Sequence, residues 1–304
     1  MASIILIFVC LAVGLGLQRA PQFQSNAYQM LNQFVVFVSL PALALFYIPK
    51  IKIDLSLLYP LGIAWITFGL SYLFFSFLGK KFGWSNRLTG CLILTAGLGN
   101  TSFVGFPIIE ALFGEEGLKT AVIVDQPGTF VVMATLGIWT ATVYANRKNE
   151  NTSIAKKVLL FPPFIAFLIA LILSVLKLDF PEILQVSFER LGNTVTPIAL
   201  VSVGMQLKFD RRNKHYQFLG LGLFFKLILI PLFFLIFYVF ILDGKGQVVE
   251  VSIIESAMAP MITGAILASQ YGLKPKLASM MVGIGIPLSF ITIAIWYWVL
   301  KMVV

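Results

Sequence analysis

Ten apolar runs divide almost the whole chain, and each is about as long as a helix needs to cross a lipid bilayer. A spanning helix takes roughly 20 mostly apolar residues. The runs cover residues 2–18, 28–48, 57–79, 88–112, 118–145, 158–177, 188–207, 216–242, 248–271 and 276–301. The sequence therefore predicts an all-α polytopic membrane protein with ten transmembrane helices.

Composition supports this fold class and excludes others. Only 12% of the 304 residues are charged, whereas a soluble domain carries about 25% charged residues. This excludes a water-soluble enzyme and a nucleic-acid-binding domain. The single histidine is His215, and the two cysteines, Cys10 and Cys91, lie in apolar runs. We therefore expect no enzymatic activity, no cofactor and no permanent metal centre.

The basic residues indicate how the chain is oriented. Fourteen Lys and Arg residues lie in the joints that follow odd-numbered runs, and seven lie on the opposite side, termini included. Cytoplasmic loops of membrane proteins carry an excess of Lys and Arg. This distribution predicts that the polar linker 146–157 is cytoplasmic and that both termini are extracytoplasmic. The net charge of +9 is then directed at anionic membrane lipids and not at nucleic acid.

The two halves of the chain repeat short patterns. Pro41, Lys52 and Asp54 recur at an offset of 156 residues as Pro197, Lys208 and Asp210. Residues 117–119 recur at an offset of 155 as residues 272–274. Five spans per copy is an odd number, so the second copy lies upside down, as in many secondary transporters. We predict a first inverted repeat at 1–145, the linker at 146–157 and a second inverted repeat at 158–304.

Runs four and nine are interrupted near their centres by glycine, proline and polar residues. Proline removes a backbone donor, and unwound backbone at membrane depth is tolerated only where it is buried in protein or lines a cavity. The predicted break residues are Gly99, Gly105, Pro107 and Pro260. At the offset of 155, Asn100 falls on Glu255 and Gly105 on Pro260. The alternative is two ordinary proline kinks, but matching interruptions in the two halves favour a transport site.

Four motifs resemble a known family. They are Gly99-Asn-Thr-Ser-Phe-Val-Gly-Phe-Pro107, Glu255-Ser-Ala-Met-Ala-Pro260, Thr196-Pro-Ile-Ala-Leu200 and Gly204-Met-Gln-Leu207. Together they resemble the signatures of the auxin efflux carrier family of bacterial transporters, over essentially the whole chain. The resemblance implies two inverted five-helix repeats, with helices 4 and 9 broken and crossing, in a fold related to that of bile-acid sodium symporters.

The same resemblance implies a mechanism. Helices 1, 2, 6 and 7 would form a scaffold, through which a homodimer can form, and helices 3–5 and 8–10 a moving core. The implied activity is secondary active transport of a small organic anion, a carboxylate, by an elevator motion in the bacterial inner membrane. Two alternatives are a Na⁺-coupled symporter of bile-acid-like substrates and a non-transporting receptor or channel on the same fold.

Polar side chains at the breaks are the candidate substrate-binding residues. Helix N-termini carry about half a positive charge each and attract anions. We expect the second half-helices to begin near residues 106–108 and 261–263. The substrate-binding candidates are Asn100, Thr101, Ser102, Ser256, Thr263 and, in run five, Gln126.

Three ionisable residues lie inside apolar runs, and such residues are functional candidates by default. Glu255 and Asn100 offer the oxygen ligands that Na⁺ prefers, so a transient Na⁺ site is one hypothesis. In a second hypothesis Glu255 or Asp125 carries a proton, which makes H⁺ the coupling ion. In a third, Lys226 forms a structural ion pair with Asp125 or Glu255. The sequence leaves these hypotheses open.

Overall fold

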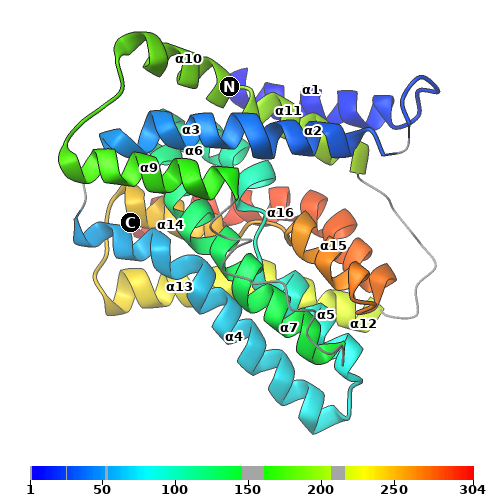
Figure 1. Ribbon diagram of the computed structural model, residues 1–304. Coiled ribbons are helices and arrows are strands. Elements are labelled where there is room, and N and C mark those ends of the chain that lie inside the picture. The colour runs from blue at the N-terminus through cyan, green and yellow to red at the C-terminus, as the bar shows by residue number, and fades with distance from the viewer. Residues whose placement is uncertain (1, 25, 52–53, 146–160, 207–215) are drawn as a thin grey trace.

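The computed structural model describes residues 2–24, 26–51, 54–145, 161–206 and 216–304 (Figure 1). The linker 146–157, Lys52, His215 and the basic residues between 208 and 214 lie outside these residues. The orientation inferred from charge therefore stays a prediction.

Within the described residues the chain is helical, apart from turns, short extended stretches and one isolated backbone bridge. The first half contains α1 (Ala2–Leu17), α2 (Tyr28–Phe34), η1 (Val35–Ser39), α3 (Leu40–Tyr47), η2 (Ile48–Lys50), η3 (Leu55–Leu57), α4 (Leu58–Phe82), α5 (Asn86–Gly97), η4 (Thr101–Gly105), α6 (Phe106–Ile123), η5 (Val124–Phe130), η6 (Met133–Gly137) and α7 (Ile138–Tyr144). The second half contains α9 (Pro162–Leu176), α10 (Glu182–Gly192), α11 (Val195–Gln206), α12 (Tyr216–Phe224), η7 (Phe225–Leu229), α13 (Ile230–Phe234), η8 (Leu235–Ile241), α14 (Gln247–Ser256), α15 (Ile262–Gln270) and α16 (Pro275–Val303).

Among the residues that the structure describes, five helical stretches are long and apolar enough to cross a membrane. They are Tyr28–Lys50, Leu55–Phe82, Thr101–Tyr144, Tyr216–Ile241 and Pro275–Val303, and the shorter apolar helices Ile5–Leu17 and Pro162–Leu176 accompany them. Large apolar side chains such as Leu73 and Ile291 are exposed on these helices. The chain is therefore a helical, multi-pass membrane protein, while the count of ten spans and the inverted repeat stay predictions.

The longest stretch, Thr101–Tyr144, is not one straight helix. Gly114 has φ 67° and ψ −163°, a left-handed conformation that interrupts α6. Glycine adopts positive φ without the steric cost that a Cβ atom brings. The stretch therefore divides at the Gly114–Gly117 turn, where the sequence places the joint between runs four and five.

The helices pack in two groups (Figure 1). One group contains α1, α2, α3, α9, α10 and α11, in which α1 packs along α11 and α3 packs against α9 and α10. The other contains α4, α5, α7 and α12 to α16, in which α4 packs against α5 and α14, and α15 against α16. Helix α6 contacts α14 as well as α1 and α11. These groups are called the upper and the lower group below, after their places in Figure 1.

Glycines bring α1 and α11 into direct backbone contact. A Cβ atom added to Gly14 would lie 2.2 Å from the carbonyl oxygen of Val201, and one added to Gly204 would lie 2.4 Å from that of Leu11. Small residues let membrane helices approach closely, and packing of this kind holds helices together in lipid. A Cβ atom added to Gly16, two residues along α1, would meet nothing within 4 Å.

We predict that Gly14→Ala lowers the free energy of unfolding by about 1–3 kcal/mol, the usual cost of overpacking. The backbone of α11 cannot move aside as a flexible side chain can. Thermal unfolding in detergent checks this, with Gly16→Ala as the matched control that stays close to the wild type. Equal unfolding temperatures for the two variants would contradict the close contact.

Candidate functional site

Two helical runs of the described structure are interrupted by non-helical backbone, and the two interrupted segments contact each other. Helix α5 ends at Gly97 and helical backbone resumes at Thr101, whereas α14 ends at Ser256 and helix resumes at Ile262. Gly99 and Pro260 form an antiparallel bridge. The Asn100 amide donates to the Ala259 carbonyl at 2.8 Å, and the Met261 amide donates to the Leu98 carbonyl at 3.0 Å. We call these paired segments, 98–100 and 257–261, the crossing.

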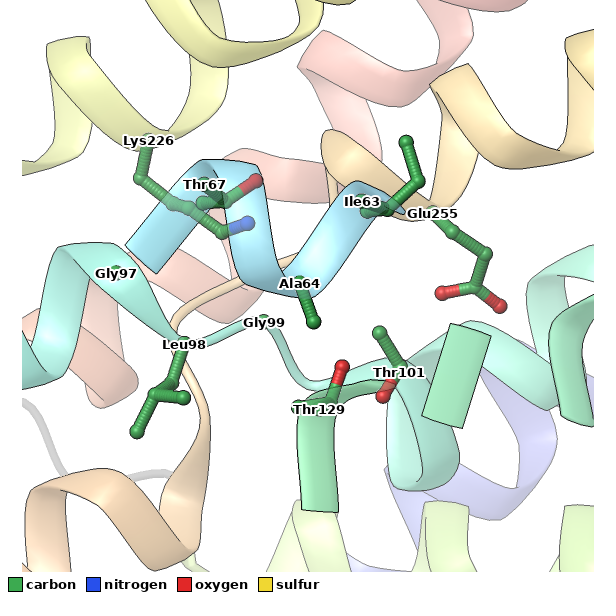
Figure 2. Close-up of a pocket in the computed structure, with 10 residues that line it drawn as sticks. All are labelled: Ile63, Ala64, Thr67, Gly97, Leu98, Gly99, Thr101, Thr129, Lys226 and Glu255. Carbon is green, nitrogen blue, oxygen red and sulfur yellow. The ribbon is translucent and has the colours of Figure 1, made fainter. Parts of the chain in front are cut away.

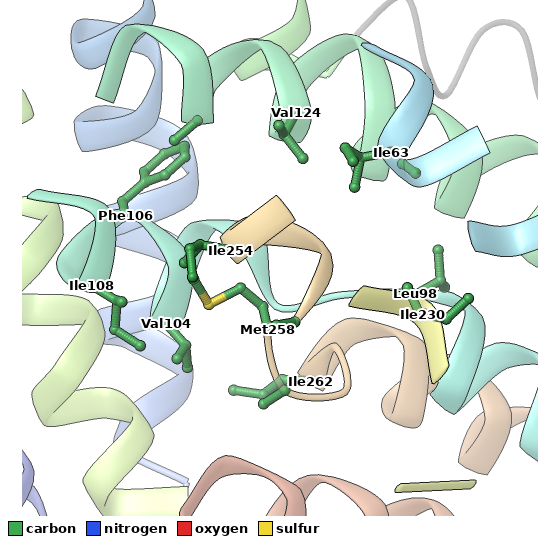
Figure 3. Packing of buried hydrophobic residues seen from close by; sticks show 14 of the residues in the cluster. Ile63, Leu98, Val104, Phe106, Ile108, Val124, Ile230, Ile254, Met258 and Ile262 are labelled. Atoms are coloured by element: carbon green, nitrogen blue, oxygen red, sulfur yellow. The ribbon is translucent and has the colours of Figure 1, made fainter. Parts of the chain in front are cut away.

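The pairing of the two segments explains how unwound backbone is stabilised in the interior of the protein. Polar backbone groups in a membrane protein must be satisfied within the protein. In the bridge, backbone amides of each segment donate to backbone carbonyls of the other. Pro260 has no N–H, and it lies opposite Gly99 at a position where the bridge needs no hydrogen bond from its nitrogen. Apolar side chains, among them Val104, Ile230 and Ile262, surround Leu98 and Met258 from the crossing (Figure 3).

Two of the four predicted break residues lie elsewhere than expected. Gly99 and Pro260 are in the crossing, but Gly105 and Pro107 lie in helical backbone, at the end of η4 and the start of α6. The helix begins five residues earlier than expected because Asn100 caps it: Asn100 Oδ1 accepts the amide of Phe103 at 3.2 Å. A π-helical turn, η4, precedes Pro107, and such turns accommodate disturbed backbone hydrogen bonding.

The structure also corrects the alignment of the two breaks. Asn100 and Met261 each precede the resumed helix, so Asn100 corresponds to Met261 and not to Glu255. The helix ends Gly97 and Ser256 are 159 residues apart, and Asn100 and Met261 are 161 residues apart. The offset of 155 residues seen at 117–119 and 272–274 therefore does not extend to the crossing. Gly105 has a different role. A Cβ atom there would lie 2.6 Å from Glu255 Oε2, so this glycine leaves space for the carboxylate.

Glu255 is fully buried, and neither carboxylate oxygen has a hydrogen-bond partner among the described residues. It lines a small cavity at the crossing, together with Thr67 of α4, Thr101 of η4, Thr129 of η5 and Lys226 of η7. The cavity leaves about 10 Å³ for the centre of a water-sized sphere, which is room for about one water molecule. Figure 2 shows Glu255 and Lys226 on opposite sides of this space. We call it the small cavity.

Asp125 differs from Glu255 because its hydrogen bonds are satisfied. Its Oδ1 accepts from Thr101 Oγ1 at 2.6 Å and from the hydroxyl of Ser102, and its Oδ2 accepts from Gln126 Nε2 at 2.8 Å. Thr101 and Ser102 are the first two residues of η4. Hydroxyls at the start of a resumed helix therefore hold the Asp125 carboxyl group, at a place where negative charge is stabilised.

A larger cavity of about 210 Å³ is lined by Asp125. Its polar lining consists of Ser102, Asp125, Gln126 and Thr263, and its apolar lining comes from both helix groups: Val36, Leu40, Phe103, Phe130, Met133, Phe161 and Met261. The rings of Phe130 and Phe161 stack with centroids 3.7 Å apart. Gln126 Oε1 has no hydrogen-bond partner among the described residues. We call this space the large cavity.

The candidate residues therefore fall into three sets: those that line the large cavity, those that line the small cavity, and those that line neither. Ser102, Gln126, Thr263 and Asp125 line the large cavity, and Glu255, Lys226 and Thr101 line the small one. Asn100 and Ser256 are not among the lining residues of either. Ser256 Oγ donates to Ile253 O at 2.6 Å within its own helix, and Asn100 caps η4 while its Nδ2 is buried without a partner in the described structure.

Sequence reasoning missed several lining residues. Thr67 carries a hydroxyl group in an otherwise apolar stretch of α4. The residue is buried, and its Oγ1 has no hydrogen-bond partner among the described residues. Thr129 lies four residues after Asp125 in run five, and a hydroxyl group so close to an intramembrane carboxylate could have indicated a site residue. Val36, Leu40 and Phe161 gave no signal, because apolar residues in apolar runs are equally suited to lipid or to a binding site.

Three π-helical turns carry polar or charged residues of the site. Thr101 and Ser102 lie in η4, Asp125 lies in η5, and Lys226 lies in η7. Such turns occur mostly as single insertions in α-helices and frequently at functional sites. They shift side chains out of the regular helical register, so helical periodicity alone does not place these residues.

The chain is similar in sequence to known proteins along nearly its whole length. Residues 1–297 match a protein family described as membrane transport protein. An uncharacterized transporter of Methanocaldococcus jannaschii is 28% identical over 309 residues, which cover 99% of this chain and 98% of the relative. An uncharacterized transporter of Methanothermobacter thermautotrophicus is 28% identical over 274 residues, covering 88% of this chain and 87% of the relative.

Proposed function

Since this chain belongs to the membrane transport protein family, the family of the auxin efflux carriers, we propose that it is a secondary active transporter of a small organic anion, a carboxylate. The observation that carries the proposal is the crossing, where two interrupted helices pair beside two cavities. Broken helices at the centre of a membrane protein are the usual place of a transporter's substrate and coupling-ion sites.

The large cavity is the proposed substrate site. Helix α15 begins there at Ile262, and no side chain caps its start, so its first amides have no partner within the helix. These amides and the hydroxyls of Ser102 and Thr263 suit a carboxylate, and the aromatic wall suits an apolar remainder. Gln126 Oε1 accepts a hydrogen bond from a donor group of the substrate.

Charge balance links this anion to a cation. Asp125, Glu255 and Lys226 are the charged side chains buried around the crossing in the described structure, so two negative charges face one positive charge when all three are ionised. An incoming carboxylate adds a further negative charge, and uncompensated buried charge is costly. Entry of one cation, H⁺ or Na⁺, at Glu255 offsets this cost and couples the two movements.

The grouping of the helices supports an elevator motion. The upper group corresponds to the scaffold of spans 1, 2, 6 and 7, and the lower group with α6 corresponds to the moving core. A hydrogen bond joins them, from Thr196 Oγ1 on α11 to Glu110 Oε2 on α6 at 2.5 Å. A third cavity, of about 280 Å³, lies between Tyr28 and Gln206 on one side and α15 and α16 on the other. It adjoins joints that are predicted to be cytoplasmic, which suits a path toward that side.

We place the carrier in the cytoplasmic membrane of a prokaryote, the inner membrane in a bacterium, with both termini extracytoplasmic. Exposed apolar side chains on α1 and α10, such as Phe8 and Ile183, support pairing of two scaffolds as well as contact with lipid.

The proposal is tested by thermal unfolding of the detergent-purified protein with a set of small carboxylates, followed by uptake of the stabilising one into liposomes. A ligand that binds the folded state raises the apparent stability by mass action. We expect stabilisation by at least one carboxylate, saturable uptake, and loss of both when Thr263 and Ser102 are replaced by Ala. Stabilisation without uptake would indicate a receptor, and uptake that does not saturate would indicate a channel.

A further inference from the structure

Lys226 touches both interruptions of the crossing. Its side chain is 1% exposed, and its Nζ donates to the carbonyl of Ser256, the last residue of α14, at 2.9 Å. A Cβ atom added to Gly99, in the other interruption, would lie 3.2 Å from the same Nζ. The ammonium group therefore lies between the end of α14 and the unwound backbone that follows α5.

This position attracts a cation for reasons that do not depend on a carboxylate. Helices α5 and α14 both end at the crossing, at Gly97 and Ser256, and helix C-termini carry about half a negative charge each. Unwound carbonyls and half-helix C-termini are the groups that coordinate Na⁺ in secondary transporters. Here a lysine side chain already donates to one of these carbonyls.

The ammonium group is not held by an ion pair. None of the ion pairs formed by the described residues involves Lys226, and both oxygens of Glu255 lack a hydrogen-bond partner. The side chain is held from the other end by η7, a π-helical turn. Trp296 Nε1 of α16 donates to the Leu227 carbonyl of this turn at 2.9 Å. The backbone that carries Lys226 is thus held by α16, and its ammonium group donates to the Ser256 carbonyl.

We propose that Lys226 is a resident cation of the crossing, occupying the place that a monovalent metal ion would take among these carbonyls. This inference rests on the proposed function, because it treats the crossing as the ion site of the carrier. It narrows that function: of the two coupling ions named above, Na⁺ is excluded from the wild-type crossing by the ammonium group. Removal of the ammonium group opens a Na⁺ site there.

The test uses the purified full-length protein in detergent and needs no substrate. Lys226→Met ends one atom short of the position of Nζ and leaves space for an ion, and Lys226→Gln is a polar variant of similar reach. Thermal unfolding is measured against NaCl, with choline chloride at equal ionic strength. We expect a saturable rise of several degrees with Na⁺ for both variants and none for the wild type or for Lys226→Arg, which keeps the charge.

The remaining outcomes also decide the inference. A Na⁺-specific rise in the wild type would show that Lys226 does not occupy the ion site, and folded variants without a Na⁺ response would show that no such site lies beneath it. Variants that fail to fold in choline but fold in Na⁺ would support it, whereas failure in both would show that Na⁺ cannot replace the ammonium group. The carboxylate assays of the proposed function are separate, so either can fail while the other holds.

Discussion

Replacing Glu255 by Gln is expected to abolish the stimulation of substrate uptake by a cation gradient while the protein still folds. The carboxylate is fully buried and lacks a hydrogen-bond partner in the described structure, so it is poised to bind a proton. Gln has the same shape but neither carries a proton at this place nor offers a negative charge. Coupling between two ligands is typically worth about 5–150-fold in affinity, and we expect the loss of this whole factor.

The measurement is accumulation of a labelled carboxylate in liposomes with and without an imposed gradient of H⁺ or Na⁺. Glu250→Gln is the matched control, because Glu250 lies on the same helix but pairs with Lys301 at 2.6 Å, away from the crossing. It should keep the stimulation. An unpaired buried charge costs free energy, so Glu255→Gln should unfold at the wild-type temperature or above. Undiminished stimulation in Glu255→Gln would remove Glu255 from the coupling role.

Asn100→Ala is expected to abolish uptake with only a modest loss of stability. Asn100 holds the crossing through two groups: its amide donates to the Ala259 carbonyl, and its Oδ1 caps the amide of Phe103. Loss of an N-cap costs about 1 kcal/mol, which a folded membrane protein tolerates. The start of η4 would no longer be fixed, however, and with it the hydroxyls of Thr101 and Ser102 that hold Asp125.

Two further variants separate the roles of the side chain. Asn100→Ser keeps a capping oxygen but lacks the buried Nδ2, so partial activity would assign the effect to the cap and complete loss to the amide nitrogen. Asn86→Ala, in the exposed first turn of α5, should transport as the wild type does. Initial rates of uptake in liposomes, with expression and thermal unfolding measured in parallel, decide between these cases. Normal uptake by Asn100→Ala would exclude Asn100 from the site.

The sequence was informative wherever polar groups interrupt apolar runs. Interrupted helices are recognisable because few residues in a spanning helix are polar, and Gly99, Asn100, Glu255 and Pro260 all lie at or directly beside the crossing. The three intramembrane charges were recognised on the same basis, and each is buried. Their buried surroundings follow from the cost of exposing charge to lipid.

The register of the break was not predictable from composition. Glycine and proline content suggested that the unwound segment extends to Pro107, but one capping side chain, Asn100, restarts the helix at Thr101. Which groups face one another was likewise undetermined. An ion pair of Lys226 was one of three open hypotheses, and in the described structure Lys226 instead donates a hydrogen bond to the Ser256 carbonyl. A backbone carbonyl freed by the break lies nearer to its ammonium group than either carboxylate does.

The apolar residues that line the large cavity could not be predicted from the sequence either. Leu40 and Phe161 come from helices far from the crossing in the sequence, and only the packing of the two helix groups brings them to Asp125 and Thr263. In a chain in which 59% of the residues are hydrophobic, no local pattern distinguishes a residue that lines a substrate site from one that faces lipid.

The central claim, that the core moves against the scaffold, is tested most directly by joining the two. The background has Cys10 and Cys91 replaced by Ala. In it, cysteines replacing Glu110 and Thr196 join the core to the scaffold. As the control, cysteines replacing Ser39 and Thr194, whose hydroxyls lie 2.7 Å apart, join two segments of the scaffold. Both pairs are bridged with a short, reducible bifunctional thiol reagent, and uptake is measured before and after reduction. We predict that the first bridge stops uptake until it is reduced and that the second leaves uptake intact. Undiminished uptake with the Glu110–Thr196 bridge fully formed would contradict the elevator account.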